Sequence, residues 1–393
     1  LNWRSFDSNI GTIDSNGKFE GISEGFVQVY ASDPDDTINY TFNVELKSCL
    51  YKKGEIIKRP NVKKNPINKI AFISNRENHF NNLYIMNSDG SEQTNLTNDS
   101  FDNSHLSWSP DNSKILYFGE GLFIINPDGT NKINLTKELN KSISYGLWSP
   151  DGTKILFIGE AQNPSIEYKL YTIKLDMTGL KEIFSTNIPI ASLSWSPDGK
   201  IITFTNASIF DNVVPGDILK INEKGEAKPL HILFNNEICL KCSSQWYYAG
   251  PSWNNDNTLF FSLLNRASWE YPSSSQSINF ILNPYDCTAN ELNPSNRSII
   301  FSEYSPYESK IAFLENVENT EQIFIANKDG SNKKQLTNSD VPKSSLQWSP
   351  DGSEILFLGY AGTGEIYKVK ADGSGIKRLT DNYYHDSSPV WSN

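Results

Sequence analysis

The sequence predicts an all-β protein whose main body is a seven-bladed β-propeller. A motif with the pattern Leu-x-Trp-Ser-Pro-Asp-Gly, in complete and weaker copies, recurs along the chain at intervals of roughly 40 to 60 residues, a period typical of stacked or radial repeats. Its aromatic anchors are Trp108, Trp148, Trp195, Trp253, Tyr304, Trp348 and Trp391. Each interval carries signals for four short strands, and four antiparallel strands repeated around an axis make a propeller.

The order of signals within a repeat predicts each strand. Leu and Trp at alternate positions place two apolar side chains on one face of the first strand. Ser-Pro-Asp-Gly forms a tight turn, because Pro presets φ, Asp tolerates the third position and Gly supplies a positive φ. A run that is apolar on both faces, such as 114–118, predicts the second strand. The third strand ends in an Asp-Gly turn, and a short fourth strand closes with Leu-Thr.

The two ends of the chain are expected to build one blade together. Residues 67–97 carry the last three strands of a repeat without a Trp strand, and Pro389-Val390-Trp391 is a Trp strand alone. Pairing them closes the ring and leaves no free sheet edge. Over residues 67–393, seven blades average about 47 residues and six about 55, and a blade typically has ~40–45.

These repeats resemble the TolB-type propeller repeat, which occurs in bacterial periplasmic TolB proteins and in propeller domains of some prolyl peptidases and oligogalacturonate lyases. The resemblance covers roughly five-sixths of the chain and implies the fold more than the function, because such propellers serve as scaffolds, binding modules and peptidase gates. Two features depart from these relatives. The TolB-type propeller resembles a version of this fold with six blades, whereas this sequence predicts seven. This sequence also has no Gly-x-Ser-x-Gly elbow of the kind that carries peptidase chemistry.

Residues 1–48 lie outside the repeat and predict a separate small β-module. Asn16-Gly17 is a hairpin turn signal. Residues 3–25, followed by the alternating strand 40–46, resemble the C-terminal part of a group 2 bacterial immunoglobulin-like domain. The resemblance implies a partial Ig-like β-sandwich that lacks its first strands. The alternative is a small all-β cap without family meaning.

Charge and composition limit the partners. Lys+Arg 35 against Asp+Glu 46 gives a net charge of −11, which repels nucleic acid and anionic membranes at long range. The sequence has no apolar run long enough for a membrane-spanning helix, and no signal peptide is visible in it. The Pro- and Lys-containing residues 49–66 are predicted to be a linker whose charges are solvated.

Few residue patterns suggest metal binding. The histidines form no HExxH pair. His105 and His385, shortly before two of the Trp anchors, are the pair that can meet near the axis, and a metal role for them is the minor alternative. Asp33, Asp35 and Asp36 are expected to form a solvated loop rather than a Ca²⁺ site. We therefore expect neither a metal nor a cofactor.

The spacing of two of the four cysteines, together with the extracellular look of the N-terminal module, favours a disulfide. Cys239-Leu-Lys-Cys242 is a lone CxxC without the second pair that a zinc site needs, and we expect these two to form a disulfide. A pair of free thiols is the alternative, and a thioredoxin-like role lacks its βαβ context. Cys49 and Cys287 stay unassigned.

Loop length provides the candidate binding site. The Ser-Pro-Asp-Gly and Asp-Gly turns share one face of the ring, so the length variation falls on the opposite face. The long segments are residues 159–169, 205–216, 231–250 and 265–276. They carry the candidate ligand-binding residues Tyr168, Phe210, Trp246, Tyr247, Tyr248, Trp269 and Tyr271. Long loops on a rigid scaffold are where binding residues gather, and the alternative is that these rings pack on each other.

The sequence therefore predicts a bacterial extracellular, cell-surface or periplasmic protein that binds a polysaccharide or a protein partner without catalysis. The first alternative is a carbohydrate-active enzyme, such as a lyase, that uses the same propeller face. The second is a structural component of a surface assembly, with the N-terminal module as a spacer. A group of carboxylates or histidines around a metal would favour the enzyme, and an aromatic-lined groove would favour the binding protein.

Overall fold

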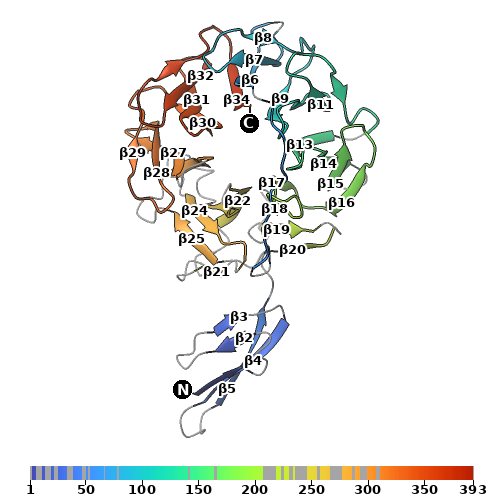
Figure 1. Ribbon diagram of the computed structural model, residues 1–393, viewed down its shortest axis with the longest axis vertical. Coiled ribbons are helices and arrows are strands. Elements are labelled where there is room, and N and C mark those ends of the chain that lie inside the picture. The colour runs from blue at the N-terminus through green and yellow to red at the C-terminus, as the bar shows by residue number, and fades with distance from the viewer. Residues whose placement is uncertain are drawn as a thin grey trace.

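The structure is a computed structural model of the full chain. It describes five strands within residues 1–46 and residues 50–392. The gaps in the second range are residues 52–53, 66, 78, 140–141, 163–165, 207–217, 223–224, 230–232, 235–245, 255–256, 266–276, 286–287, 293–298 and 307–309. The described secondary structure consists of strands, and seven sheets stand around a central axis as the blades of a propeller (Figure 1). The predicted fold class and blade number are thus confirmed.

The first blade joins both ends of the propeller. Blade 1 comprises β34 (Asp386–Trp391), β6 (Lys69–Ser74), β7 (Asn82–Asn87) and β8 (Thr94–Asn95). In the pairing of β34 with β6, Trp391 lies opposite Ile70 and Val390 opposite Ala71. The missing Trp strand therefore comes from the C-terminal end, as the repeat pattern predicts.

The remaining blades follow in chain order. Blade 2 comprises β9 (Ser104–Trp108), β10 (Ile115–Phe118), β11 (Leu122–Ile125) and β12 (Ile133–Asn134). Blade 3 comprises β13 (Ser142–Trp148), β14 (Lys154–Gln162), β15 (Ile166–Lys174) and β16 (Lys181–Thr186). Blade 4 comprises β17 (Ile190–Trp195), β18 (Ile202–Asn206), β19 (Ile218–Ile221) and β20 (Ala227–Pro229).

Three blades complete the ring. Blade 5 comprises β22 (Trp246–Trp253), β23 (Leu259–Asn265), β24 (Ser277–Leu282), β25 (Thr288–Leu292) and the parallel edge strand β21 (Leu233–Phe234). Blade 6 comprises β26 (Ile299–Tyr304), β27 (Lys310–Val317), β28 (Thr320–Asn327) and β29 (Lys334–Gln335). Blade 7 comprises β30 (Lys343–Trp348), β31 (Glu354–Tyr360), β32 (Gly364–Lys370) and β33 (Lys377–Arg378).

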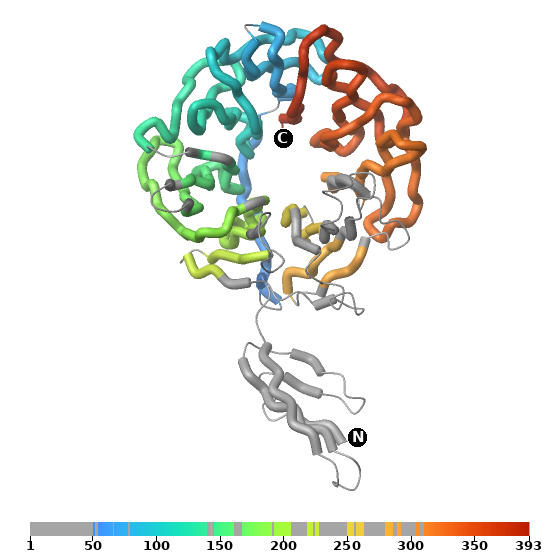
Figure 2. Tube along the Cα trace, turned by 180° about the vertical axis from the view of Figure 1, so that it is seen from behind, coloured from blue at the N-terminus to red at the C-terminus, as the bar shows by residue number. Residues whose placement is uncertain are grey.

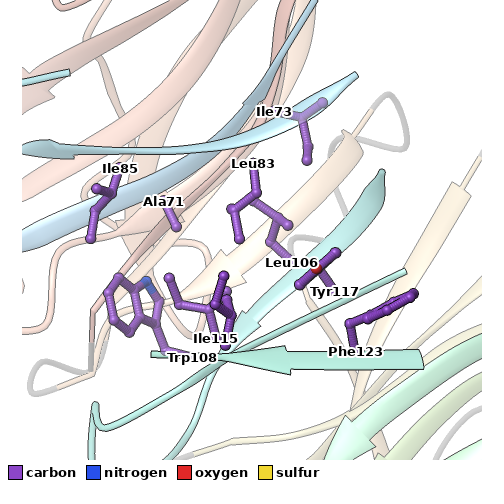
Figure 3. Packing of buried hydrophobic residues seen from close by; sticks show 10 residues of the cluster. Ala71, Ile73, Leu83, Ile85, Leu106, Trp108, Ile115, Tyr117 and Phe123 are labelled. Carbon is purple, nitrogen blue, oxygen red and sulfur yellow. The ribbon is translucent and has the colours of Figure 1, made fainter. Parts of the chain in front are cut away.

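The hydrophobic core lies between neighbouring blades. Figure 3 shows one such cluster, in which Leu83 and Ile85 of blade 1 face Leu106 and Trp108 of blade 2. The Trp108 side chain is buried, and its indole N–H donates to the Val390 carbonyl of blade 1 at 3.2 Å. Trp148, Trp348 and Trp391 are also buried, and the remaining anchors are partly buried against the core clusters, so the anchors pack in the core as predicted.

The Leu-Thr pairs have a different place from the one predicted. They follow the short fourth strands instead of ending them, as β8 and β33 show. In blade 7, Thr380 Oγ1 accepts a hydrogen bond from the Ile366 N–H at 2.9 Å, which satisfies a buried donor at the start of the third strand. The same contact joins Thr97 to Leu83. The Thr side chain therefore links the residues that follow the fourth strand to the backbone of the third strand.

The N-terminal residues form strands β1 (Asn2–Ser5), β2 (Gly11–Ile13), β3 (Phe19–Gly21), β4 (Gly25–Ser32) and β5 (Asn39–Leu46). β1, β4 and β5 make one antiparallel sheet, and β2 pairs with β3. These strands fit an all-β module, and its Ig-like identity stays a prediction. Asp33, Asp35, Asp36 and Cys49 lie outside the described residues.

Candidate binding face

The tight turns between first and second strands lie on one face, which we call the turn face. In blade 7, Ser349 Oγ donates to Asp351 Oδ1 at 2.6 Å and accepts from the Glu354 N–H at 2.9 Å. Gly352 has the predicted positive φ, 70°. The same Ser–Asp contact recurs in blades 2, 3 and 4. Side chains of the motif thus satisfy one another and the turn backbone.

These turns give a testable dependence of stability on pH. The hydrogen bond from Ser349 holds the pKa of Asp351 below its usual value. A carboxyl whose folded pKa is depressed stabilises the fold above its unfolded pKa, and this contribution is lost as the pH falls through the folded value. We expect the free energy of unfolding to fall as the pH drops below about 4, the usual pKa of a free Asp side chain. Urea unfolding should show a smaller fall for Asp351→Asn, which keeps an acceptor oxygen, and an equal fall in both proteins would contradict the assignment.

Residues 50–65 cross the turn face, and we call this segment the strap (Figures 1 and 2). Tyr51 Oη donates to Asp198 Oδ1 in the blade 4 turn at 2.5 Å, and Arg59 donates to the Asn254 carbonyl in blade 5 at 2.6 Å. Further along, the Asn65 N–H donates to the Asp111 carbonyl in blade 2 at 2.8 Å. The strap therefore touches the turns of three blades.

The strap also contributes to the core. Leu50, Tyr51 and Ile57 are buried in one cluster with side chains of blades 4 and 5, and the Tyr51 ring meets Trp253 edge-on at 6.0 Å. Burial, followed by the hydrogen bond to Asp198, raises the pKa of the Tyr51 phenol. The predicted solvation of the charged side chains holds for Lys58, which is exposed. The apolar residues between them, however, fix the segment to the ring.

The opposite face, which we call the loop face, carries the connections between second and third strands and between blades. Here the predicted binding residues have mixed outcomes. The prediction placed Trp246, Tyr247, Tyr248 and Tyr168 in loops. In the structure the first three belong to the inner strand β22 and Tyr168 belongs to β15, so this placement is wrong. The remaining candidates, Phe210, Trp269 and Tyr271, fall outside the described residues, as do Cys239, Cys242 and Cys287.

Backbone geometry explains the misplacement of Trp246 to Tyr248. Gly250-Pro251 interrupts the strand signal in the sequence. In the structure Gly250 has a φ of 63°, and the register of β22 against β23 shifts between Ala249 and Ser252. A β-bulge takes up the extra residue, so the strand continues to Trp246. Tyr168 is likewise paired, opposite Glu160 and Thr186.

The two histidines considered as a metal pair turn toward different blades. The His105 ring packs edge-on against Phe118 and against Tyr145 of blade 3, with centroids 5.8 and 6.0 Å apart. The His385 ring stacks on Tyr360 of blade 7, with centroids 6.2 Å apart. Across the described part of the chain, no three His, Cys, Asp or Glu side chains lie close enough to hold a metal ion.

The structure reveals an aromatic group on the loop face that the sequence analysis did not predict. Tyr383, Tyr384 and His385 form the connection from blade 7 to blade 1, and Tyr360 ends β31 beside them. Tyr383 is 97% exposed, Tyr384 42% and Tyr360 38%. We call these four residues the aromatic platform. A sequence signal existed, because two adjacent tyrosines, Tyr383 and Tyr384, follow the Leu379-Thr380 pair after only two residues.

Two buried carboxylates hold the platform connection in place. Asp386, with no exposed surface, accepts from Arg76 Nη2 at 3.0 Å and from Asn382 Nδ2 at 2.8 Å. Glu365, 1% exposed, accepts from the Asn382 N–H at 3.2 Å and pairs with Arg378 at 3.0 Å. Buried charges that are paired and fully hydrogen-bonded fix a unique geometry around them. The backbone beneath the platform is therefore preorganised.

The platform is also tied to its neighbours by backbone contacts. The His385 N–H donates to Asn75 Oδ1 of blade 1 at 2.9 Å, and the Gly364 N–H donates to His385 Nδ1 at 3.1 Å. A Cβ on Gly364 would lie 2.5 Å from His385 Cε1, so only glycine leaves room for this ring position. Because Nδ1 accepts, the ring proton sits on Nε2.

No helix in the described residues is long and apolar enough to cross a bilayer.

Comparison with known proteins shows the fold and leaves the family open. No family model and no curated protein matches the sequence. Among solved structures, TolB from Acinetobacter baumannii matches with a TM-score of 0.50 and 16% identity, over 94% of this chain and 80% of that one. An oligogalacturonate lyase in complex with manganese matches with a TM-score of 0.64 and 14% identity, over 92% and 95%.

A hydrolase shares the same architecture over part of its length. Puromycin hydrolase matches with a TM-score of 0.62 and 12% identity, over 82% of this chain and 54% of its own length, so this chain spans about half of that enzyme. At sequence identities this low, the similarity shows a shared fold and does not show a shared activity. This protein is thus a seven-bladed β-propeller with structural similarity to TolB, a lyase and a hydrolase.

Proposed function

We propose that this protein is a non-catalytic binding protein of the bacterial exterior, in the extracellular space, on the cell surface or in the periplasm. It recognises a polysaccharide or a protein partner through the loop face of the propeller. The partial Ig-like character of residues 1–48 and the Cys239–Cys242 disulfide belong to the same proposal, since both are typical of exported proteins.

The contrast between the two faces is the observation that supports this function most. On the turn face, the motif side chains satisfy one another and the strap lies across three blades. On the loop face, the connections vary in length and expose aromatic rings that no blade core uses. Exposed aromatics on a rigid scaffold are typical of recognition surfaces.

A lyase-like enzyme on the same face is the second candidate, favoured by the likeness to the oligogalacturonate lyase over most of both chains. The net charge of −11 counts against it for a polyanionic substrate, because like charges slow encounter and weaken binding. A structural role in a surface assembly is compatible with the same face, if its partner is a protein.

Retention and chain length together test the proposal. The full chain is incubated with immobilised neutral and acidic polysaccharides and with envelope protein fractions, and each polysaccharide is then sized by chromatography. We expect retention on at least one material, with every polysaccharide unchanged in length. Shortening of a polysaccharide would identify an enzyme and reject the non-catalytic function.

The aromatic residues of blade 5 provide a second test. Trp246→Ala and Trp269→Ala are each expected to weaken retention by about thirtyfold, since losing one aromatic anchor costs about 2 kcal/mol or more. The melting temperature should stay within a few degrees. Leu180→Ala, an exposed site on the turn face, is the control and should bind like the parent. Lower stability with unchanged binding would show that these rings pack within blade 5.

A further inference from the structure

We propose that the aromatic platform, defined above as Tyr360, Tyr383, Tyr384 and His385, binds an uncharged polysaccharide. This inference rests on the proposed binding function and specifies its ligand class and its location, on blades 7 and 1. The platform is distinct from the aromatic residues of blades 3 to 5 that the sequence predicts.

Exposure is the first argument. A single exposed tyrosine is ordinary on a protein surface, but three of them beside an exposed histidine on one face are a patch. The other large apolar side chain exposed on the loop face of blades 1 and 7, among the described residues, is Phe80, which is also aromatic. Flat aromatic rings suit the flat apolar face of a sugar ring, on which they can stack.

Rigidity is the second argument. The Tyr384 N–H donates to Asn382 Oδ1 at 2.8 Å, and Asn382 is itself bonded to both buried carboxylates, Glu365 and Asp386. The rings therefore project from a backbone that is fixed before any ligand arrives. Binding to a preorganised surface avoids most of the cost of ordering a loop. The hydrogen bonds already hold this connection in place, so the exposed Tyr383 ring adds nothing to its stability and is free to contact a ligand.

The available polar atoms fit sugar hydroxyls. Nε2 of His385 carries the ring proton, because Nδ1 accepts from the Gly364 N–H, and it can donate to a hydroxyl oxygen. Tyr360 Oη and Ser344 Oγ lie 3.1 Å apart at the platform edge, and hydroxyls both donate and accept. Stacking against a ring face and hydrogen bonding at its edge are the two contacts that a sugar offers.

Charge selects an uncharged polymer over an acidic one. The chain has a net charge of −11, and at the platform connection the carboxylates of Asp381, Glu365 and Asp386 outnumber the cations, since Asp381 itself pairs with Arg378 at 2.9 Å. The cations beneath the platform, Arg76 and Arg378, are already paired with Asp386 and Glu365. An anionic polysaccharide would therefore meet repulsion without a free counter-charge at these residues.

Co-sedimentation of the full chain with insoluble polymers tests the proposal. The probes are cellulose, chitin, β-1,3-glucan and granular starch, with cross-linked polygalacturonate as the acidic polymer. We expect retention on at least one neutral polymer, and loss of at least about thirtyfold in affinity for the double variant Tyr383→Ala, Tyr384→Ala. Tyr384→Phe should keep most of the binding, because the ring remains. Ile376→Ala, an exposed turn-face site of the same blade, should bind like the parent.

His385→Ala tests the role of the histidine separately, because it removes the ring that accepts from the Gly364 N–H and leaves the residues of the connection otherwise unchanged. We expect weaker binding with Tyr383 and Tyr384 intact. The inference is overturned if the parent binds no neutral polymer, or if the double variant and the parent bind equally. Retention on polygalacturonate or a protein alone, or loss of binding only in Trp246→Ala, would overturn it while leaving the proposed binding function standing. Shortened polymer chains would overturn the non-catalytic function itself.

Discussion

A chain that ends at Asp386 is expected to lose most of the thermal stability of the propeller. This truncation removes nearly all of β34, whose Trp391 is 4% exposed in the core between blades 1 and 7. Replacing a single buried Trp by Ala already costs about 3–5 kcal/mol. The truncation also removes the Ser392 hydroxyl that bridges Ile67 and Lys69, and it leaves β6 as a free edge.

Calorimetry of the truncated and full chains checks this expectation. We expect a large drop in melting temperature together with aggregation, because an unpaired strand is a template for other chains. Ser392→Ala is the matched control, since it keeps β34 and removes only the bridging hydroxyl, for a loss of about 1 kcal/mol. A truncated chain that melts like the parent would show that β34 does not close the ring.

Tyr51→Ala is expected to destabilise the protein by about 3–5 kcal/mol, the usual cost of emptying a large buried aromatic site. The Tyr51 side chain is 3% exposed and completes the core shared by blades 4 and 5. The melting temperature should fall by roughly 10 °C, at about 2–4 °C for each kcal/mol. Tyr51→Phe removes only the hydrogen bond to the Asp198 carboxylate and should cost about 2 kcal/mol.

The neighbouring Ile56 provides the control for the strap. Its side chain is 80% exposed, so Ile56→Ala should change stability by less than about 0.5 kcal/mol. Denaturant unfolding of the three variants ranks them directly. If Tyr51→Ala and Ile56→Ala unfold at the same denaturant concentration, the strap is a passive connection and the core of blades 4 and 5 does not depend on it.

Sequence reasoning located the blades well and the candidate site less well. Blade number and closure follow from a periodic pattern, so the missing strand before Lys69 and the isolated Pro389-Val390-Trp391 point to each other. The position of Trp246 was misjudged because a bulge at Gly250 has the composition of a strand end. Bulge and turn differ in long-range pairing and not in local residue preference.

The sequence by itself determined the features built from local signals. Alternating apolar residues set the strands, and in blades 2, 3, 4 and 7 the Ser–Asp contact of the turn spans two residues, so these repeats specify their turns locally. Only the tertiary structure decided where the strap docks and how the platform is held. Tyr51 meets Asp198 across 147 positions, and Arg76 meets Asp386 across 310. Such pairs leave no periodic trace, because each is a single contact between side chains that the closed ring brings together.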